Sequence, residues 1–327
     1  MRWMLCSGLI AVFLTGRGAA SQEPATPKVP AEALTLTLTM DRTEYRLGEE
    51  ASAEVRLRNC SSHPIRVHEL LLESRSLSFE IAGGTPAPIV YTVTRPDVFS
   101  SQHAGPWRVL LGAGRDIAVI VPIPLVRPGS HRITAVYRGA GSPDSGLRSP
   151  PVPVNVSADP GPTLVATLDL ALPDRRDVSS LVIGLEPDNA PVHVMNFINL
   201  ARQGFYDGQR VFRIVPDFVI QSGCPRGSGS GGPGYCLPNE HVVSRRHTRG
   251  TLSMNHPPGR PDAAGSQFFL CVKDAPSLDL PGERYTAFGQ VLEGIETLDA
   301  ASSIETDPKT LAPLSPVLIR RVAISAR

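Results

Sequence analysis

The sequence has almost no lysine, almost no net charge and, beyond its first 20 residues, no long apolar run. Lysine occurs three times and the formal net charge is +1. The chain as a whole therefore lacks the positive field that nucleic acids or anionic membranes attract. No segment after residue 20 approaches 18 consecutive apolar residues, which excludes a transmembrane helix there. Neither the cysteines nor the histidines have the spacing of metal ligands, so we expect no metal site.

Proline and glycine are abundant instead, with 32 and 29 of the 327 residues. This composition favours many turns and short strands over long helices. Hydrophobic residues make up 41% of the chain and charged residues 19%, which is enough apolar material for packed cores and too little charge for a disordered protein. The length predicts two domains rather than one.

The first 20 residues have the pattern of a secretory signal. Arg2 precedes an apolar stretch over residues 3–14, and the small residues 18–20 precede Ser21. Residues 21–32 are polar and proline-rich, which is typical of a flexible linker. We therefore expect an exported protein, periplasmic or extracellular, with no membrane span after cleavage. An uncleaved signal would tether it to the membrane.

Four cysteines follow the signal, at Cys60, Cys224, Cys236 and Cys271. In an oxidising compartment an even number permits disulfides, with three possible connectivities. Cys224 and Cys236 flank a glycine-rich loop and are the favoured pair. Free buried thiols explain Cys60 and Cys271 equally well.

Residues 33–157 alternate between apolar and polar side chains. Leu34, Leu36 and Leu38 alternate with threonines, and similar short runs recur up to residue 156, separated by turn residues. A period of two is that of half-buried strands. Seven or eight such strands predict an antiparallel, immunoglobulin-like β-sandwich. Its histidines are scattered, and adhesion, partner docking and spacing are all open as its role.

A cluster of chain-breaking residues at 157–162 marks the boundary to a second domain over residues 163–327. Residues 164–172 and 179–185 are predicted as strands by their apolar content. A helix is predicted to open at Pro191 and to end at Gly204, because four residues form one apolar stripe: Val194, Phe197, Ile198 and Ala201.

Apolar, strand-like runs in this domain contain isolated polar residues. Arg213 and Gln221 lie in the run 211–223, and Gln267 lies in the run 265–271. Such residues must find partners or face a wet cleft. One guanidinium, two glutamines and several aromatic rings, without an acid pair, a nucleophile or a metal cluster, indicate binding and polarisation rather than covalent chemistry. A structural arginine paired with an acid is the alternative explanation of Arg213.

The glycine-rich loop 223–234 has the composition of a phosphate loop. It lacks the Gly-Lys-Ser/Thr ending of such loops, and no helical pattern follows it. We therefore expect no nucleotide site.

Groups of residues follow one another along this domain: Asn196-Phe197, Gly204-Phe205-Tyr206-Asp207-Gly208, Phe212-Arg213 with Gln221, Gly250-Thr251-Leu252-Ser253-Met254, Gly265-Ser266-Gln267-Phe268-Phe269 and Phe288-Gly289. In this order and spacing they resemble the motifs of cyclophilins, the peptidyl-prolyl cis-trans isomerases, of bacterial type. The resemblance covers residues 163–327. It implies an eight-stranded antiparallel β-barrel capped by two helices, with the active groove on its outer face, so that the whole chain is mostly β.

The resemblance also implies roles for the residues that match its motifs. The implied catalytic residues are Arg213, then Gln221, which orients the arginine and contacts substrate, and Phe218 of the proline pocket. The implied substrate-binding residues are Val219, Gln267, Phe269, Leu278, Tyr285, Asn255 and His256. The loop after Met254 is longer than in the family, which leaves the register of Asn255 and His256 open. The glycine-rich loop becomes a rim of the groove, with Cys224 and Cys236 as its possible staple. We expect Phe268 and Phe288 in the core, and His241, His247 and His256 in surface loops.

These roles predict a peptidyl-prolyl cis-trans isomerase that needs no cofactor and assists the folding of exported proteins. Its partners would be polypeptides with X–Pro bonds, and neither nucleic acid nor nucleotide is expected. Arg213 would stabilise the twisted prolyl amide in an apolar groove. The alternative is a non-catalytic chaperone or scaffold that captures proline-containing segments, with the sandwich as a partner-docking module.

Overall fold

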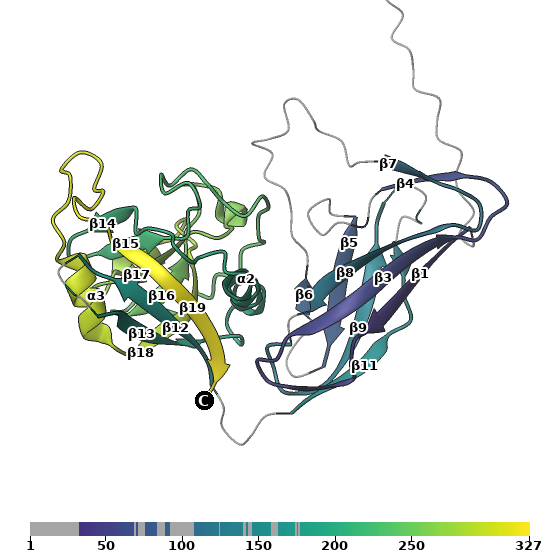
Figure 1. Cartoon of the computed structure of the whole chain (residues 1–327), viewed down its shortest axis with the longest axis horizontal. Coiled ribbons are helices and arrows are strands. Elements are labelled where there is room, and N and C mark those ends of the chain that lie inside the picture. Colours follow the sequence, from purple (N-terminus) through teal and green to yellow (C-terminus); the bar gives the residue numbers. More distant parts are fainter. Residues whose placement is uncertain are drawn as a thin grey trace, which may run out of the picture.

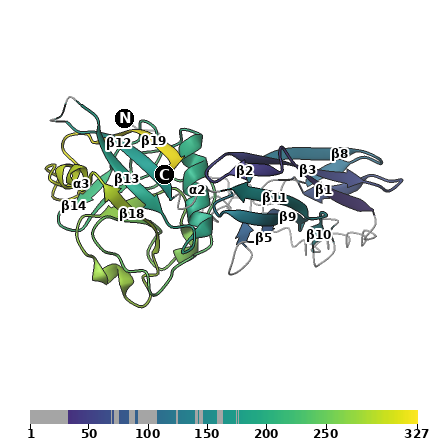
Figure 2. The same ribbon diagram turned by 90° about the horizontal axis from the view of Figure 1, so that it is seen from below.

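The computed structural model describes residues 33–68, 70, 76–83, 89–91, 108–123, 125–139, 142, 146–157, 163–173, 175 and 177–327. The predicted signal, the 21–32 linker and most of the predicted boundary at 157–162 lie outside the described residues. The described chain forms two β-rich units, an N-terminal one and a C-terminal one, seen in two perpendicular views in Figures 1 and 2. Neither described helix is long and apolar enough to cross a membrane.

The N-terminal unit contains two principal sheets. One has the order β1-β3-β8, formed by Leu34–Met40, Ala51–Asn59 and Asp116–Ile123. The other has the order β2-β11-β9-β5-β6, with β10 beside β9. Its strands are β2 (Glu44–Arg46), β5 (Leu77–Ala82), β6 (Ile89–Tyr91), β9 (Gly129–Tyr137), β10 (Leu147–Arg148) and β11 (Val152–Ser157). The short strands β4 (Ile65–His68) and β7 (Arg108–Leu111) pair with each other.

The predicted sandwich is confirmed by how these sheets face each other. Every second residue of β1 is buried, and β1 packs against β9, β10 and β11 of the other sheet. The core between them contains Leu36 and Leu57 from one sheet, and Phe79 and Tyr137 from the other. One pair departs from the expected antiparallel arrangement, because β2 runs parallel to β11. Tyr45 anchors β2 there, since its buried ring enters the core.

The C-terminal unit is the predicted eight-stranded barrel. Its strands are β12 (Leu164–Ala171), β13 (Ser179–Leu185), β14 (Arg213–Val215), β15 (Val219–Ser222), β16 (Thr251–Met254), β17 (Phe268–Cys271), β18 (Thr286–Glu293) and β19 (Leu318–Ala326). They follow the order β14-β15-β17-β16-β18-β13-β12-β19, and every pair is antiparallel. The segment before β14 closes the sheet on β19, because the Val211 N–H donates to the Val317 carbonyl at 2.9 Å and the Ile319 N–H to the Gln209 carbonyl at 2.7 Å.

Two α-helices accompany the barrel, as expected: α2 (Pro191–Arg202) and α3 (Ile295–Ser302). Pro191 opens α2 at the first helical turn, where its missing N–H costs nothing. The carboxylate of Glu240 then accepts the N–H groups of Val192 and His193, at 3.0 and 2.9 Å. A distant acid thus takes the place of an N-cap side chain and complements the helix dipole.

The barrel core is built around the aromatic rings of α2 and the strands. The ring centroid of Phe197 on α2 lies 5.6 Å from that of Phe268 and 5.4 Å from that of Phe288. The expected core role of Phe268 and Phe288 is therefore confirmed, since both are buried.

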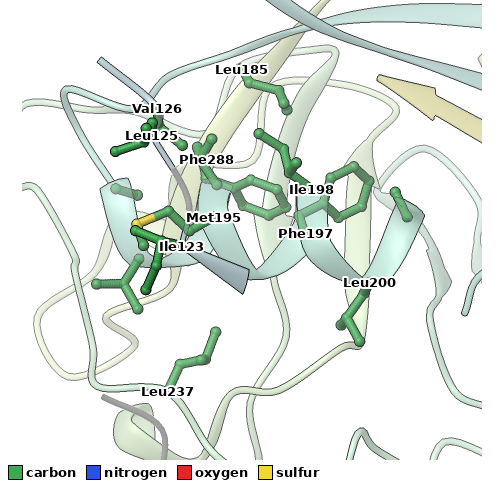
Figure 3. Packing of buried hydrophobic residues seen from close by; sticks show 14 of the residues in the cluster. Ile123, Leu125, Val126, Leu185, Met195, Phe197, Ile198, Leu200, Leu237 and Phe288 are labelled. Atoms are coloured by element: carbon green, nitrogen blue, oxygen red, sulfur yellow. The ribbon is translucent and has the colours of Figure 1, made fainter. Parts of the chain in front are cut away.

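Helix α2 lies on the side of the barrel that faces the sandwich (Figures 1 and 2). Ile123, Leu125 and Val126 of the sandwich gather beside Met195 of α2 in one buried cluster (Figure 3). The buried Arg127 adds polar contacts, because its Nη2 donates to the Pro187 carbonyl at 3.1 Å and its Nε lies 3.2 Å from Asp188 Oδ1. The two units therefore share an apolar interface with a charged contact at its edge.

Candidate active site

Three of the expected site residues occupy one line across the barrel sheet. Arg213 on β14 is directly opposite Gln221 on β15, which is directly opposite Phe269 on β17. Directly opposed residues in antiparallel strands point to the same face of the sheet. The next line, which includes Ile214 and Ile220, belongs to the main core. Arg213, Gln221 and Phe269 therefore project from the outer face of the barrel.

Arg213 is oriented by a neutral partner. Its Nη1 donates to Gln221 Oε1 at 3.4 Å, and the arginine is half-buried while the glutamine is buried. Within the described part of the chain, no ion pair joins Arg213 to a carboxylate. The alternative of a structural arginine neutralised by an acid therefore does not describe this residue. Its positive charge therefore lies on the outer face of the barrel without a carboxylate partner among the described residues.

The expected proline-pocket residues form an apolar cluster of their own, separate from the main core. Val219, Phe269, Cys271, Ala275 and Leu278 are its buried members, and Val215, Phe218 and Tyr285 pack against them. The expected residues Phe218, Val219, Phe269, Leu278 and Tyr285 are thus brought together. Sequence reasoning missed Val215, Cys271 and Ala275. The alternation along the strands could have identified the first two. Val215 and Cys271 are each directly opposite Val219 and so point to the same face of the sheet.

Tyr285 packs against this apolar cluster, within reach of the charge of Arg213. Its ring meets that of Phe269 edge to face, with centroids 5.5 Å apart and planes at 84°. Burial raises the pKa of Tyr285, nearby Glu283 raises it further, and the positive charge of Arg213 opposes both. The phenol is therefore a neutral hydrogen-bonding group at ordinary pH, close enough to Arg213 to feel its charge.

Gln267 is at the expected place but its amide is already engaged. Its Nε2 donates to the carbonyls of Gly229 and Gly231, at 2.8 and 2.7 Å. Its Oε1 accepts from Asn255 Nδ2 at 3.3 Å. Gln267 therefore holds the glycine-rich loop against the barrel. Asn255, whose position in the longer loop the sequence left open, lies beside Gln267.

His256 was expected in a surface loop, but it is buried. It is 4% exposed, with Nδ1 2.9 Å from the Pro257 carbonyl and Nε2 2.9 Å from the Glu283 carbonyl. Its ring stacks on Tyr285 with centroids 4.3 Å apart. Both ring nitrogens thus face carbonyls of this chain and the ring packs on Tyr285, and the role of His256 in substrate binding stays a prediction.

The expected disulfide between Cys224 and Cys236 is not formed, since Cys224 is a free buried thiol, as is Cys271. Cys236 is buried as well. The backbone N–H of Gly231 donates to the Cys224 sulfur at 3.2 Å. Burial by itself raises the pKa of Cys224, but backbone N–H groups of the glycine-rich loop outweigh it and hold the pKa below its ordinary value. The glycine-rich loop is therefore folded around this sulfur by its own amides and needs no staple.

His247 was expected in a surface loop, and this prediction is wrong. The residue is 1% exposed, and its ring stacks on Phe269 of the apolar cluster. His241 is half-buried, with Nδ1 3.1 Å from the Tyr285 carbonyl. In the described part of the chain, no group of three or more histidine, cysteine, aspartate or glutamate residues is arranged to hold a metal ion.

Comparison with known proteins shows which family the C-terminal unit resembles. Residues 174–324 match the family model of cyclophilin type peptidyl-prolyl cis-trans isomerases. A peptidyl-prolyl cis-trans isomerase of Helicobacter pylori is 47% identical over 114 residues, which cover 34% of this chain and 67% of that protein. One of Synechococcus elongatus is 43% identical over 38% of this chain and 81% of its own length. The peptidyl-prolyl cis-trans isomerase B of Bacillus subtilis is 42% identical over 37% of this chain and 81% of its own length.

Proposed function

The chain belongs to the cyclophilin-type peptidyl-prolyl cis-trans isomerase family, and we propose that Arg213 supplies the transition-state stabilisation for its isomerase activity on exported polypeptides. Rotation about an X–Pro bond is slow because amide resonance imposes a barrier of about 18–20 kcal/mol. The reaction breaks no covalent bond. A catalyst must therefore bind the twisted amide more tightly than either planar isomer.

The apolar cluster is suited to hold the prolyl ring. Phe218, Val219, Phe269 and Leu278 present buried or half-buried apolar surfaces on the outer face of the barrel. A pyrrolidine ring held there stays still while the preceding carbonyl group swings. Binding of this kind favours planar and twisted forms alike, so it contributes affinity and orientation rather than rate.

Arg213 is suited to recognise the twisted form. In that form the prolyl nitrogen becomes pyramidal and regains a lone pair, to which a guanidinium N–H can donate. The arginine has five N–H donors, and Gln221 accepts from one of its terminal nitrogens. A planar, permanently charged fork keeps its direction better than a lysine ammonium. The single observation that supports this proposal most is the neutral Gln221 partner, which orients the arginine without neutralising it.

The test is an exchange NMR assay of the full-length protein with a blocked peptide that contains one Ala–Pro bond. Arg213→Ala is expected to lower kcat about a hundredfold, by analogy with the loss of one preorganised donor. Arg213→Lys is the matched control, because it keeps the charge and loses the fork, and we expect it to recover little of the rate. An alanine variant with the wild-type rate would remove Arg213 from the mechanism. A wild-type protein that binds the peptide without accelerating exchange would instead support the non-catalytic chaperone.

The export of the protein and its action on exported clients form the second part of the proposal. They are supported by the charged, apolar and small-residue pattern of residues 1–20 and by the proline-rich stretch that follows. The sandwich over residues 33–157 is proposed as a module that docks to a partner. Cell fractionation with sequencing of the mature N-terminus tests the export. A mature chain that begins near Ser21 in the exported fraction is expected, and a purely cytoplasmic, full-length chain would contradict it.

A further inference from the structure

His247 is buried against the apolar cluster, and its polar atoms join three segments of the barrel. Its Nδ1 lies 2.7 Å from Asp279 Oδ1, and its Nε2 lies 2.9 Å from Ser253 Oγ. Its backbone N–H points at the same carboxylate, 3.2 Å from Oδ1, and its carbonyl accepts the Ala275 N–H at 2.8 Å. The residue therefore connects β16 to both ends of the short helix η3 (Pro276–Asp279).

The hydrogen bonds define a single form of the ring. A carboxylate only accepts, so Nδ1 carries the ring proton towards Asp279. In the neutral imidazole Nε2 then accepts the hydroxyl proton of Ser253. Burial lowers the pKa of His247, and this outweighs the attraction of Asp279, which raises it. The imidazole is therefore neutral, with one tautomer and one orientation.

The ring orientation matters because His247 packs against Phe269 and Tyr285 of the apolar cluster. It stacks on Phe269 with centroids 5.9 Å apart and planes at 26°, and it meets the edge of Tyr285 at 6.4 Å. Ser253 is directly opposite Phe269 across β16 and β17. Asp279 directly follows the pocket residue Leu278 on η3. Two pocket residues, Phe269 and Leu278, are thus fixed by elements that His247 ties together.

We propose that His247 is a positioning residue of the isomerase, which holds Phe269 and Leu278 in the shape that accepts the prolyl ring. This inference rests on the proposed function of the groove. At 1% exposure His247 touches no substrate itself. A slackened pocket would bind the planar and the twisted peptide less well to the same degree. Loss of the His247 side chain therefore weakens peptide affinity and leaves kcat nearly unchanged, whereas loss of the Arg213 side chain lowers kcat.

The order Ser253–His247–Asp279 is also that of a hydrolytic triad, but here it cannot supply a nucleophile. Ser253 is 0% exposed, and His247 and its surroundings cover it. A triad serine must reach a substrate carbonyl with its Oγ. The same hydrogen-bond geometry therefore serves to brace the pocket.

The experiment measures Kd and kcat separately by exchange NMR, with full-length protein and the blocked Ala–Pro peptide. His247→Phe keeps a ring against Phe269 and removes both side-chain hydrogen bonds. We expect Kd to rise about five- to tenfold while kcat stays within about threefold of wild type. His193→Phe is the matched control: it is another fully buried histidine, bonded to the Glu240 carboxylate at 2.7 Å, but it lies on α2 against the main core. We expect it to lower the melting temperature and to leave Kd unchanged.

Ser253→Ala provides a second route if His247→Phe does not fold, because it removes one hydrogen bond with little change of volume. A Kd about threefold above wild type is expected for it. A folded His247→Phe or Ser253→Ala protein with the wild-type Kd would overturn the inference, and so would an equal rise of Kd in His193→Phe. A wild-type protein that catalyses no exchange would contradict the proposed function instead, so the two failures are distinguishable.

Discussion

Arg213 and Gln221 stand directly opposite each other on β14 and β15, and the arginine Nη1 lies 3.4 Å from the glutamine Oε1. The pair joins a fixed charge to a neutral acceptor on the outer face of the barrel. Its geometry separates two properties that a catalytic arginine needs, namely direction and charge. Gln221 supplies the direction, and the absence of a carboxylate partner in the described chain preserves the charge.

The first prediction concerns this pair. Gln221→Leu keeps the volume and removes the acceptor, so Arg213 retains its charge but loses its orientation. We expect kcat to fall about tenfold in the exchange NMR assay, with a smaller change in Kd. Gln221→Glu keeps an acceptor and adds a negative charge, which would pair with the guanidinium. This variant is expected to fold normally and also to lose rate. Wild-type kcat in Gln221→Leu would show that the glutamine does not orient the arginine.

The second prediction concerns pH and stability. The pKa of His247 in the folded protein lies below its ordinary value of 6.5, and burial is the main cause. Between the folded and the unfolded pKa the unfolded chain binds more protons. The contribution of His247 to stability is therefore fully present above pH 6.5 and is lost as pH falls towards the folded pKa. We expect the free energy of unfolding to decrease between pH 7.5 and pH 5.5 on this account.

Urea unfolding of wild type and His247→Phe at several pH values isolates this contribution, because all other groups titrate in both proteins. The variant is expected to be less stable at pH 7.5 and to lose less stability than wild type as the pH falls. Parallel curves for the two proteins would mean that His247 does not titrate below its ordinary range.

The strands, and the placement of Arg213 and Gln221 outside the main core, could be predicted because they depend on local patterns. The period-two alternation of residues 33–157 reports burial on one face of a strand. In the same way, the isolated polar residues Arg213 and Gln221 in an apolar run indicated a strand face that does not belong to the apolar core. These signals are local, since a strand buries or exposes alternate residues wherever its partner strand comes from.

The errors concern residues whose surroundings come from distant segments. His247 looked like a loop residue, but its partners Ser253 and Asp279 and its neighbour Phe269 arrive from three other elements. The same holds for the thiols of Cys224 and Cys236, because flanking a loop does not bring two sulfur atoms together. Pairing of residues across loops depends on tertiary packing, which spacing along the chain does not encode.

The third prediction concerns the interface between the two units. Arg127 is buried at the edge of their interface, with Nη2 bonded to the Pro187 carbonyl and Nε 3.2 Å from Asp188. Arg127→Ala removes both contacts and exposes the neighbouring apolar cluster around Met195 to water (Figure 3). We expect the sandwich to detach part of the time, so that the radius of gyration in small-angle X-ray scattering increases and amide exchange in α2 becomes faster.

Arg66→Ala is the matched control, since Arg66 is an exposed arginine of β4 in the same sandwich, and its scattering should equal that of wild type. The groove residues lie on β14, β15 and β17, whereas the interface lies on α2, so kcat of Arg127→Ala should also stay at the wild-type value. An unchanged radius of gyration and unchanged amide exchange in α2 would mean that the apolar contacts maintain the interface without Arg127. A lower kcat together with detachment would mean that the sandwich helps to shape the groove.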